Sequence, residues 1–287
     1  MKLAVAATAP LGADVLERLA AKHDIAYLLT RPDRPQGRGR KLAPPPAKVA
    51  AERLGIDVRQ PERLDDFEPE AGTVVVAAYG VLIPESVLDR ALWLNVHPSL
   101  LPRWRGAAPI ERALMAGDEE TGVTIIELVP ELDAGPIAAQ RALALTPEDD
   151  FGTVSARAGE LATELLEEAL PEPTLRPQPA EGVTYAEKIG PEDRLLDPTH
   201  TAPENERVVR ALHPHIGARI AREDADPLRV TAAAICPHVE DVAPGRLAER
   251  DGRLLWGCAE EALELLEVQP PGGRPMEAAA FLRGHAL

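Results

Sequence analysis

The first 170 residues alternate between short apolar runs and the three-to-four-residue spacing of amphipathic helices. The apolar runs predict strands at 3–9, 25–30, 56–60, 73–79, 92–97, 122–129 and 136–144. The helical spacing predicts helices at 12–22, 46–54, 109–116 and about 152–169, with a short helix after Pro84. The run at 73–79 (TVVVAAY) is almost continuously apolar, which is typical of a central parallel strand covered on both faces. This strand–helix alternation predicts the α/β class with an open sheet.

The pattern changes after residue 170, where Pro-rich sequence follows the last of these helices. The segment 173–194 is interpreted as a semi-rigid linker between a first domain at 1–172 and a second at 195–287. A helix is predicted at 203–212. Short strands are then predicted at 217–222, 228–235, 245–249, 253–257 and 262–268, although the last also has helical propensity. Short strands at this spacing favour a small β-barrel.

The strand at 92–97 carries the residues with the clearest chemical potential. Strand alternation places Asn95 and His97 on the same face, and Pro98 ends the strand. Catalytic groups of open α/β sheets lie beyond the carboxyl ends of strands. Asp133 follows in a Leu-Asp-Ala-Gly turn. An amide, an imidazole and a carboxylate can bind an oxyanion, move a proton and orient the ring, as acyl transfer to an amine requires. A structural His97 and a turn-forming Asp133 are the alternatives.

Charge is distributed unevenly along the 287 residues. The chain has 31 basic and 47 acidic residues, a net charge of −16, so any contact with nucleic acid must be local. The segment 31–48 has six basic residues against Asp33 alone, a charge of +5. Because Gly37 and Gly39 let this loop change shape, it is a plausible clamp for polyphosphate, although most charged loops are merely solvated. No Gly-x-Gly-x-x-Gly follows the first strand, so the sequence does not support NAD chemistry.

Other motifs leave alternatives open. Residues 99–102 (SLLP) form either an ordinary loop or the wall of a flat ligand site, and 103–109 (RWRGAAP) either a solvated turn or an anion or base-stacking surface. His213 and His215 lack a recognisable metal-ligand spacing, and no metal is expected. Two widely spaced cysteines predict buried thiols and a reducing, cytoplasmic setting. No apolar run approaches the roughly 18–20 residues of a membrane span.

Residues 94–110 (LNVHPSLLPRWRGAAPI) closely resemble the active-site region of the formyltransferases that use 10-formyltetrahydrofolate. The turn containing Asp133 is similar to the turn that carries that family's acid. The basic loop RPDRPQGRGRKLAPPPAK resembles the insertion of the family's Met-tRNA-specific branch. Segments 74–84, 183–189 and 265–276 fit the same branch, so the resemblance covers nearly the whole chain.

The resemblance implies a Rossmann-like formyltransferase domain followed by an OB-like, tRNA-binding domain. It implies transfer of formyl from 10-formyltetrahydrofolate to the methionine amine of initiator Met-tRNA, without a metal, by a protein expected to be monomeric. The implied catalytic residues are Asn95, His97 and Asp133. The implied folate-site residues are Ser99, Leu100, Leu101 and Pro102. The implied tRNA-binding residues are Arg34, Arg38, Arg40 and Lys41.

Two departures from the family pattern stand out. The first strand of the family usually leads into a Gly-Thr-Pro turn, whereas this chain has Ala-Thr-Ala-Pro at 7–10. The family's second domain is often basic, whereas residues 191–287 contain 11 Arg and Lys against 17 Asp and Glu, a net charge of −6. The rival functions are amino-sugar nucleotide N-formylation, formyltetrahydrofolate hydrolysis, and non-catalytic folate or RNA binding.

Overall fold

The computed structural model describes residues 1–36, 41–222, 225–237 and 242–285. The chain divides into two compact units. The first contains residues 1–109, 120–144 and 155–186, and the second contains residues 110–119, 145–154 and 187–287. Arg38 and Arg40 lie outside the described residues.

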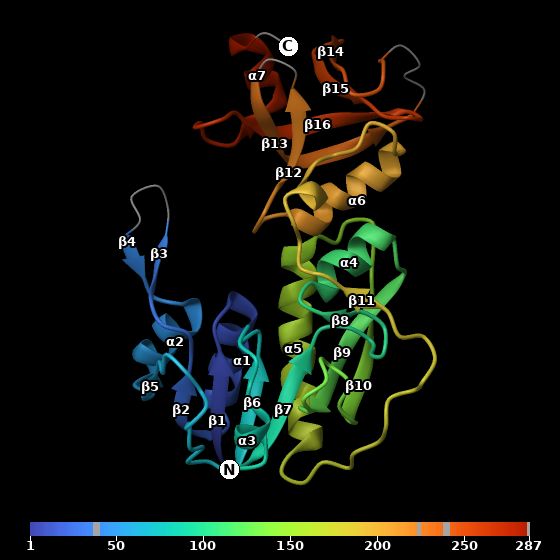
Figure 1. Ribbon diagram of the computed structural model, residues 1–287. Helices are drawn as coiled ribbons and strands as arrows, with labels where there is room; N and C mark the ends of the chain where they lie inside the picture. The colour runs from blue at the N-terminus through green and yellow to red at the C-terminus, as the bar shows by residue number, and fades with distance from the viewer. Residues whose placement is uncertain (37–40, 223–224, 238–241, 286–287) are drawn as a thin grey trace. The chain divides into compact units, whose positions relative to one another are not determined.

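The first unit is built on a mixed sheet of seven strands, in the order β10-β9-β7-β6-β1-β2-β5 (Figure 1). The strands are β1 (Lys2–Ala7), β2 (Asp24–Leu29), β5 (Val58–Arg59), β6 (Thr73–Ala77), β7 (Leu92–His97), β9 (Glu120–Glu127) and β10 (Ile137–Ala144). The strands from β7 to β5 are parallel to their neighbours, whereas β9 and β10 are antiparallel additions. The predicted open α/β sheet is confirmed.

Two apolar layers cover this sheet. On one face, strand residues such as Val75 and Leu94 pack with residues of α1 (Pro10–Ala20), α2 (Pro46–Leu54) and α5 (Phe151–Ala169). On the other face, Val74 and Trp93 pack with residues near α3 (Glu85–Leu88). All five residues of β6 are buried. Burial on both faces explains the continuous apolar run that the sequence shows at 73–79.

Segments predicted as loops also contain strands. Within 31–46, β3 (Arg34–Gln36) pairs antiparallel with β4 (Lys41–Ala43), and this pair is called the β3–β4 hairpin below. Propensity did not reveal it, because its strands are three residues long and basic or Pro-rich. In addition, β8 (Arg105–Gly106) pairs with β11 (Tyr185–Ala186), which lies within the segment interpreted as a linker.

The second unit contains an antiparallel sheet in the order β12-β13-β16-β15-β14, with β17 paired to β16. Its strands are β12 (Ala218–Arg222), β13 (Ala225–Cys236), β14 (Leu247–Arg250), β15 (Arg253–Gly257), β16 (Ala262–Gln269) and β17 (Met276–Glu277). Its helices include α6 (Ala202–Leu212) and α7 (Ala278–Gly284), and most of α4 (Pro109–Ala116) belongs to it. The strand prediction for 262–268 is confirmed, since β16 pairs with β13 and β15. An OB-like closed barrel stays a prediction.

Both cysteines are buried thiols, as the sequence predicts: Cys236 is 6% exposed and Cys258 is 3% exposed. Burial raises the pKa of Cys258 to about 11, so this thiol is protonated at neutral pH. Among the described helices, none is both long and apolar enough to cross a membrane.

Candidate active site

The candidate site lies where β7 ends. Asn95 is paired with Val76 on β6 and with Ile126 on β9, and His97 is paired with Thr124 on β9. Strands β6 and β9 therefore fix the register of β7 along both of its edges. The hydrogen-bonded strands therefore hold Asn95 and His97 on one face at the carboxyl end of β7, as the alternation predicts.

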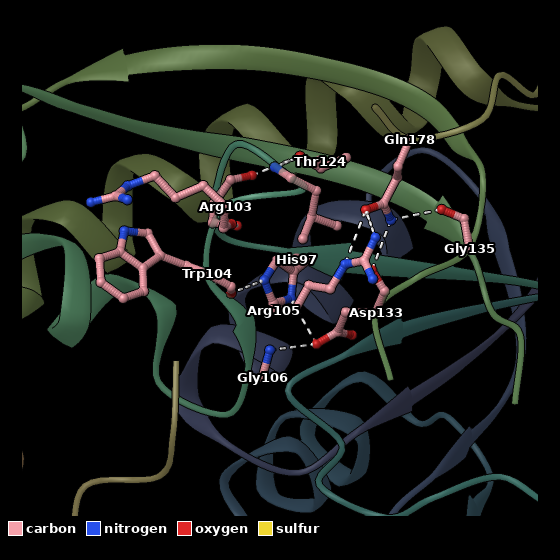
Figure 2. Close-up of polar contacts among 11 residues, drawn as sticks. His97, Arg103, Trp104, Arg105, Gly106, Thr124, Asp133, Gly135 and Gln178 are labelled. Atoms are coloured by element: carbon pink, nitrogen blue, oxygen red, sulfur yellow. Dashed lines mark hydrogen bonds and ion pairs between the residues drawn. The ribbon is translucent and has the colours of Figure 1, made fainter. Parts of the chain in front are cut away.

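The imidazole of His97 lies between a carbonyl and a carboxylate (Figure 2). Nε2 is 2.8 Å from the carbonyl oxygen of Trp104, and Nδ1 is 3.6 Å from Oδ2 of Asp133. Because a carbonyl can only accept, Nε2 carries the ring proton and donates it to Trp104. The neutral ring therefore presents the lone pair of Nδ1 to Asp133, and a proton added at Nδ1 lies beside the carboxylate.

Burial decides the protonation state of His97, which is only 3% exposed. Loss of solvation lowers the pKa of His97 below its ordinary value of 6.5, although the negative charge of Asp133 opposes the shift. The carbonyl of Trp104 also opposes it, and the nearby charge of Arg105 adds to it. At neutral pH the ring is therefore neutral and able to accept a proton.

Asp133 is positioned by main-chain contacts. Its Oδ2 accepts a hydrogen bond of 2.8 Å from the amide N–H of Gly106. Its own backbone has a left-handed φ of +48°. Two residues later, a Cβ placed on Gly135 would lie 1.7 Å from the carbonyl oxygen of Glu127, so only glycine fits there. The glycine of the Leu-Asp-Ala-Gly sequence is thus a steric requirement of the turn that carries the acid.

Gln178 links this turn to the segment around β8 (Figure 2). Its amide nitrogen donates to the carbonyl oxygens of Asp133 and Gly135 at 2.7 and 2.8 Å. Its Oε1 accepts from Nε and Nη2 of Arg105 at 3.2 and 2.6 Å. This contact could not be predicted from sequence, because Gln178 lies in the Pro-rich segment 173–194, more than 40 residues from its partners.

The segment 99–102 is fastened to β9 through Thr124. The Thr124 hydroxyl donates to the carbonyl of Ser99 at 2.6 Å and accepts from the amide of Leu101 at 3.2 Å. Ser99 is fully buried and Leu101 is 3% exposed, whereas Leu100 and Pro102 are half-buried. The segment is therefore a rigid wall beside His97.

Asn95 has a half-buried side chain and makes no side-chain hydrogen bond within the described chain. It lies two residues before His97 on the same face of β7. A polar amide at the end of a strand, with its hydrogen-bonding capacity unused, is available to a ligand.

Two family models match the chain: Formyl transferase over residues 1–170 and Formyl transferase, C-terminal domain, over residues 188–286. The methionyl-tRNA formyltransferase of Halorhodospira halophila is 45% identical over 91% of this chain and 88% of that protein. The methionyl-tRNA formyltransferase of Paracoccus denitrificans is 42% identical over 100% of this chain and 98% of that protein. The chain belongs to the methionyl-tRNA formyltransferase family.

Several solved structures share the fold of this chain at low sequence identity. HypX from Aquifex aeolicus has a TM-score of 0.68 at 20% identity; the match covers 99% of this chain, which spans only 49% of HypX. HypX has also been solved in complex with tetrahydrofolic acid. An N-formyltransferase from Helicobacter canadensis has a TM-score of 0.65 at 14% identity, covering 92% of this chain and 98% of that one.

The β3–β4 hairpin is the segment whose sequence resembles the insertion of this family. Arg34 and Lys41 are exposed at the start of β3 and β4. Lys48 differs, because its Nζ donates to both Asp33 carboxylate oxygens at 2.9 Å and to Gln60 at 2.9 Å. Among the described cations, Lys48 is therefore held by Asp33 and Gln60, whereas Arg34 and Lys41 are exposed to solvent.

The remaining candidates of the sequence lie elsewhere. His215 is 3.0 Å from Glu111 and stacks on Phe151 with ring centroids 3.7 Å apart. His213 is 3.9 Å from Asp150. Among the described residues there is no group of three potential metal ligands. Within RWRGAAP, the Arg103 guanidinium lies 4.3 Å from the centre of the Trp104 ring, and Arg105 belongs to the network of Asp133.

Proposed function

We propose that this protein transfers the formyl group of 10-formyltetrahydrofolate to the α-amine of methionine on initiator Met-tRNA, for translation initiation. The observation that carries the proposal is a neutral His97 whose Nδ1 faces Asp133, beside an Asn95 amide with unused hydrogen-bonding capacity. The full-length relatives named methionyl-tRNA formyltransferase support the same acceptor.

In the proposed reaction, the amine attacks the formyl carbon and its excess proton must leave. A free α-amine has a pKa of about 7.7–8.0, so a base near neutrality is required. We assign this role to His97. Nδ1 is its receiving atom, because Nε2 already donates to Trp104. The Asp133 carboxylate, 3.6 Å away, stabilises the imidazolium that forms.

We assign the stabilisation of the oxyanion to the side-chain amide of Asn95. As the N–C bond to the amine forms, the formyl oxygen gains negative charge, and an amide donor at this place stabilises it. Collapse of the tetrahedral intermediate breaks the bond between the formyl carbon and N10 of the folate, and N10 takes up a proton, which balances the proton that the amine gave to His97. No metal is required, since the leaving group is a stabilised amine.

The donor and acceptor are assigned to different segments. Residues Ser99, Leu100, Leu101 and Pro102 form the proposed wall of the folate site, and the half-buried side chains of Leu100 and Pro102 support this assignment. Arg34, Arg38, Arg40 and Lys41 are the proposed tRNA contacts, supported by the +5 charge of 31–48 in a chain of −16.

We further propose that 1–172 is the catalytic domain and 195–287 an OB-like tRNA-binding domain, joined by 173–194, in a monomeric cytoplasmic enzyme. The antiparallel sheet of the second unit supports this assignment. Its acidic composition makes the basic hairpin the main electrostatic contact with tRNA.

The test is to follow labelled formyl from 10-formyltetrahydrofolate in parallel incubations with Met-tRNA, an amino-sugar nucleotide or buffer alone. We expect label on the methionine amine of Met-tRNA. Label on the sugar amine, or release of formate at the same rate in all three incubations, would overturn the proposal. His97→Gln serves as the inactive control.

A further inference from the structure

A cavity of about 360 Å³ lies at the base of the β3–β4 hairpin. Its lining comes from the segments that follow β2, β5 and β6. The charged and polar residues are Arg31, Arg34, Glu62, Arg63, Asp65 and Tyr79. A volume of this size is at the lower end of small-molecule sites and fits a single nucleotide unit.

Two arginines in this lining are unpaired. The side chains of Arg31 and Arg34 make no ion pair or hydrogen bond within the described residues. The acid between them in sequence, Asp33, is occupied, because it accepts hydrogen bonds from Gln60 and Lys48 at 2.9 Å. These bonds lower the pKa of Asp33, so it remains ionised and committed to its partners. The arginine charges are therefore available to a ligand.

The carboxylates of the cavity offset this charge only in part. Asp65 is already paired with Arg63 at 2.9 Å. That leaves Glu62 against Arg31 and Arg34, a net charge of +1. The sign favours an anion, and two guanidinium groups supply the planar donors that match a phosphate.

Tyr79 adds a neutral donor to the same cavity. The residue is 4% exposed, and its hydroxyl makes no hydrogen bond within the described chain. Burial raises the pKa of Tyr79 to about 12, so the hydroxyl keeps its proton at neutral pH. Arg31 lies close by: a Cβ placed on Gly80 would be 3.8 Å from its Nη1.

Apolar residues make up much of the remaining lining. Val81 and Leu82 are 41% and 81% exposed. Pro61 and Pro84 also line the cavity. Exposed apolar side chains that line a cavity together offer a contact surface to a ligand. A flat base on these apolar residues and a phosphate on the arginines would use both kinds of lining.

Strand register places the cavity beside the catalytic strand. Ala77 is paired with Val96 in the parallel β6–β7 ladder, so Tyr79 and His97 follow at the same edge of the sheet. Adjacent strands are about 4.8 Å apart. A nucleotide chain whose terminal amine lies at His97 would therefore pass close to this cavity.

We propose that Arg31, Arg34 and Tyr79 form a subsite for a backbone phosphate of the single-stranded 3′ end of the acceptor tRNA, with its base on Val81 and Leu82. The proposal rests on the proposed function, since it assumes that a tRNA carries the amine. It adds Arg31 and Tyr79 to the tRNA contacts proposed above on Arg34, Arg38, Arg40 and Lys41.

The test compares Arg31→Gln and Tyr79→Phe with a matched charge control, Arg53→Gln. Arg53 of α2 is exposed, pairs with Glu17 of α1 at 2.6 Å, and does not line the cavity. For Arg31→Gln we expect a roughly tenfold higher KM for Met-tRNA with kcat unchanged. The slope of log affinity for uncharged tRNA against log salt should fall by about 0.7, the value for one single-strand phosphate. Tyr79→Phe should raise the same KM less and leave the slope unchanged.

A tRNA lacking its three terminal nucleotides locates the contact. With it, wild type and Arg31→Gln should bind equally; a persisting difference would overturn the subsite. A wild-type slope in Arg31→Gln, or a raised KM for formyltetrahydrofolate alone, would also overturn it, the latter assigning the cavity to a folate carboxylate. If wild type binds tRNA and Arg31→Gln lowers the salt slope as expected, but wild type transfers no formyl group to Met-tRNA, the proposed function is wrong and the subsite stands. If wild type does not bind tRNA, both fall.

Discussion

His97 and Asp133 have side chains that are 4% and 10% exposed, whereas Lys41 of the β3–β4 hairpin is exposed to solvent. At the first place, main-chain groups of Trp104 and Gly106 fix the atoms that react. At the second, charge density matters more than the position of any one atom. Buried groups act through geometry in a low-dielectric site, and exposed charges act through a field that salt screens.

This difference predicts effects of different size and different salt dependence. Single substitutions at the site around His97 should lower the rate of the chemical step by orders of magnitude at any salt concentration. Changes on the hairpin should alter binding alone, and less so as salt rises.

The largest effect is expected for Asp133→Asn. The amide still accepts the hydrogen bond of Gly106 but cannot stabilise a proton on Nδ1 of His97. By analogy with other carboxylate–histidine pairs, single-turnover formylation should fall about 10³–10⁴-fold. Asp89→Asn, an exposed acid without a side-chain partner in the described chain, is the matched control. Equal rates for the two variants would remove Asp133 from the mechanism.

Asn95→Ala should come next. Loss of one oxyanion donor costs about 10²–10³-fold in the chemical step, which is about 2.7–4 kcal/mol of barrier. The side chain is half-buried and makes no hydrogen bond in the described chain, so the thermal unfolding midpoint should stay near that of the wild type. Single-turnover kinetics with saturating Met-tRNA measures the effect, and a near-wild-type rate would sink the assignment.

The hairpin should give a smaller effect that depends on salt. Replacing Arg38, Arg40 and Lys41 by Gln should weaken tRNA binding about 10–100-fold near 0.1 M salt and reduce the log–log salt slope by about 2–3. Turnover with saturating tRNA should be unchanged. Binding titrations across a salt series test this prediction, and an unaltered slope would contradict the clamp.

The smallest effect is expected in the pH dependence of stability. Because burial lowers the folded-state pKa of His97 below 6.5, the unfolded chain binds more protons as pH falls through 6.5. This contribution to the free energy of unfolding is complete above pH 6.5 and is lost on acidification toward the folded pKa. Urea unfolding at pH 7.5 and 5.5 should show a smaller loss for His97→Gln than for wild type; equal losses would mean that His97 is not desolvated.

The sequence predicted that Asn95 and His97 lie at the end of β7, but not the contacts that position the site. Alternation in 92–97 was enough to place Asn95 and His97 on one face, because side-chain direction in a strand has a fixed period of two. Gln178 and the Trp104 carbonyl could not be predicted, since both act through contacts that bring separate segments together. The β3–β4 hairpin was also missed, because three-residue strands carry too few positions for a periodic signal.

The sequence by itself determined the α/β alternation, the fully buried β6, the polar pair on β7 and the charge asymmetry between 31–48 and the rest of the chain. These are local properties, which depend on periods and composition within one segment. Only the tertiary structure decided that Nδ1 of His97 faces Asp133, and that Arg31, Arg34 and Tyr79 meet at one cavity. Those outcomes depend on burial and on distances between segments far apart in the chain, which a one-dimensional pattern does not contain.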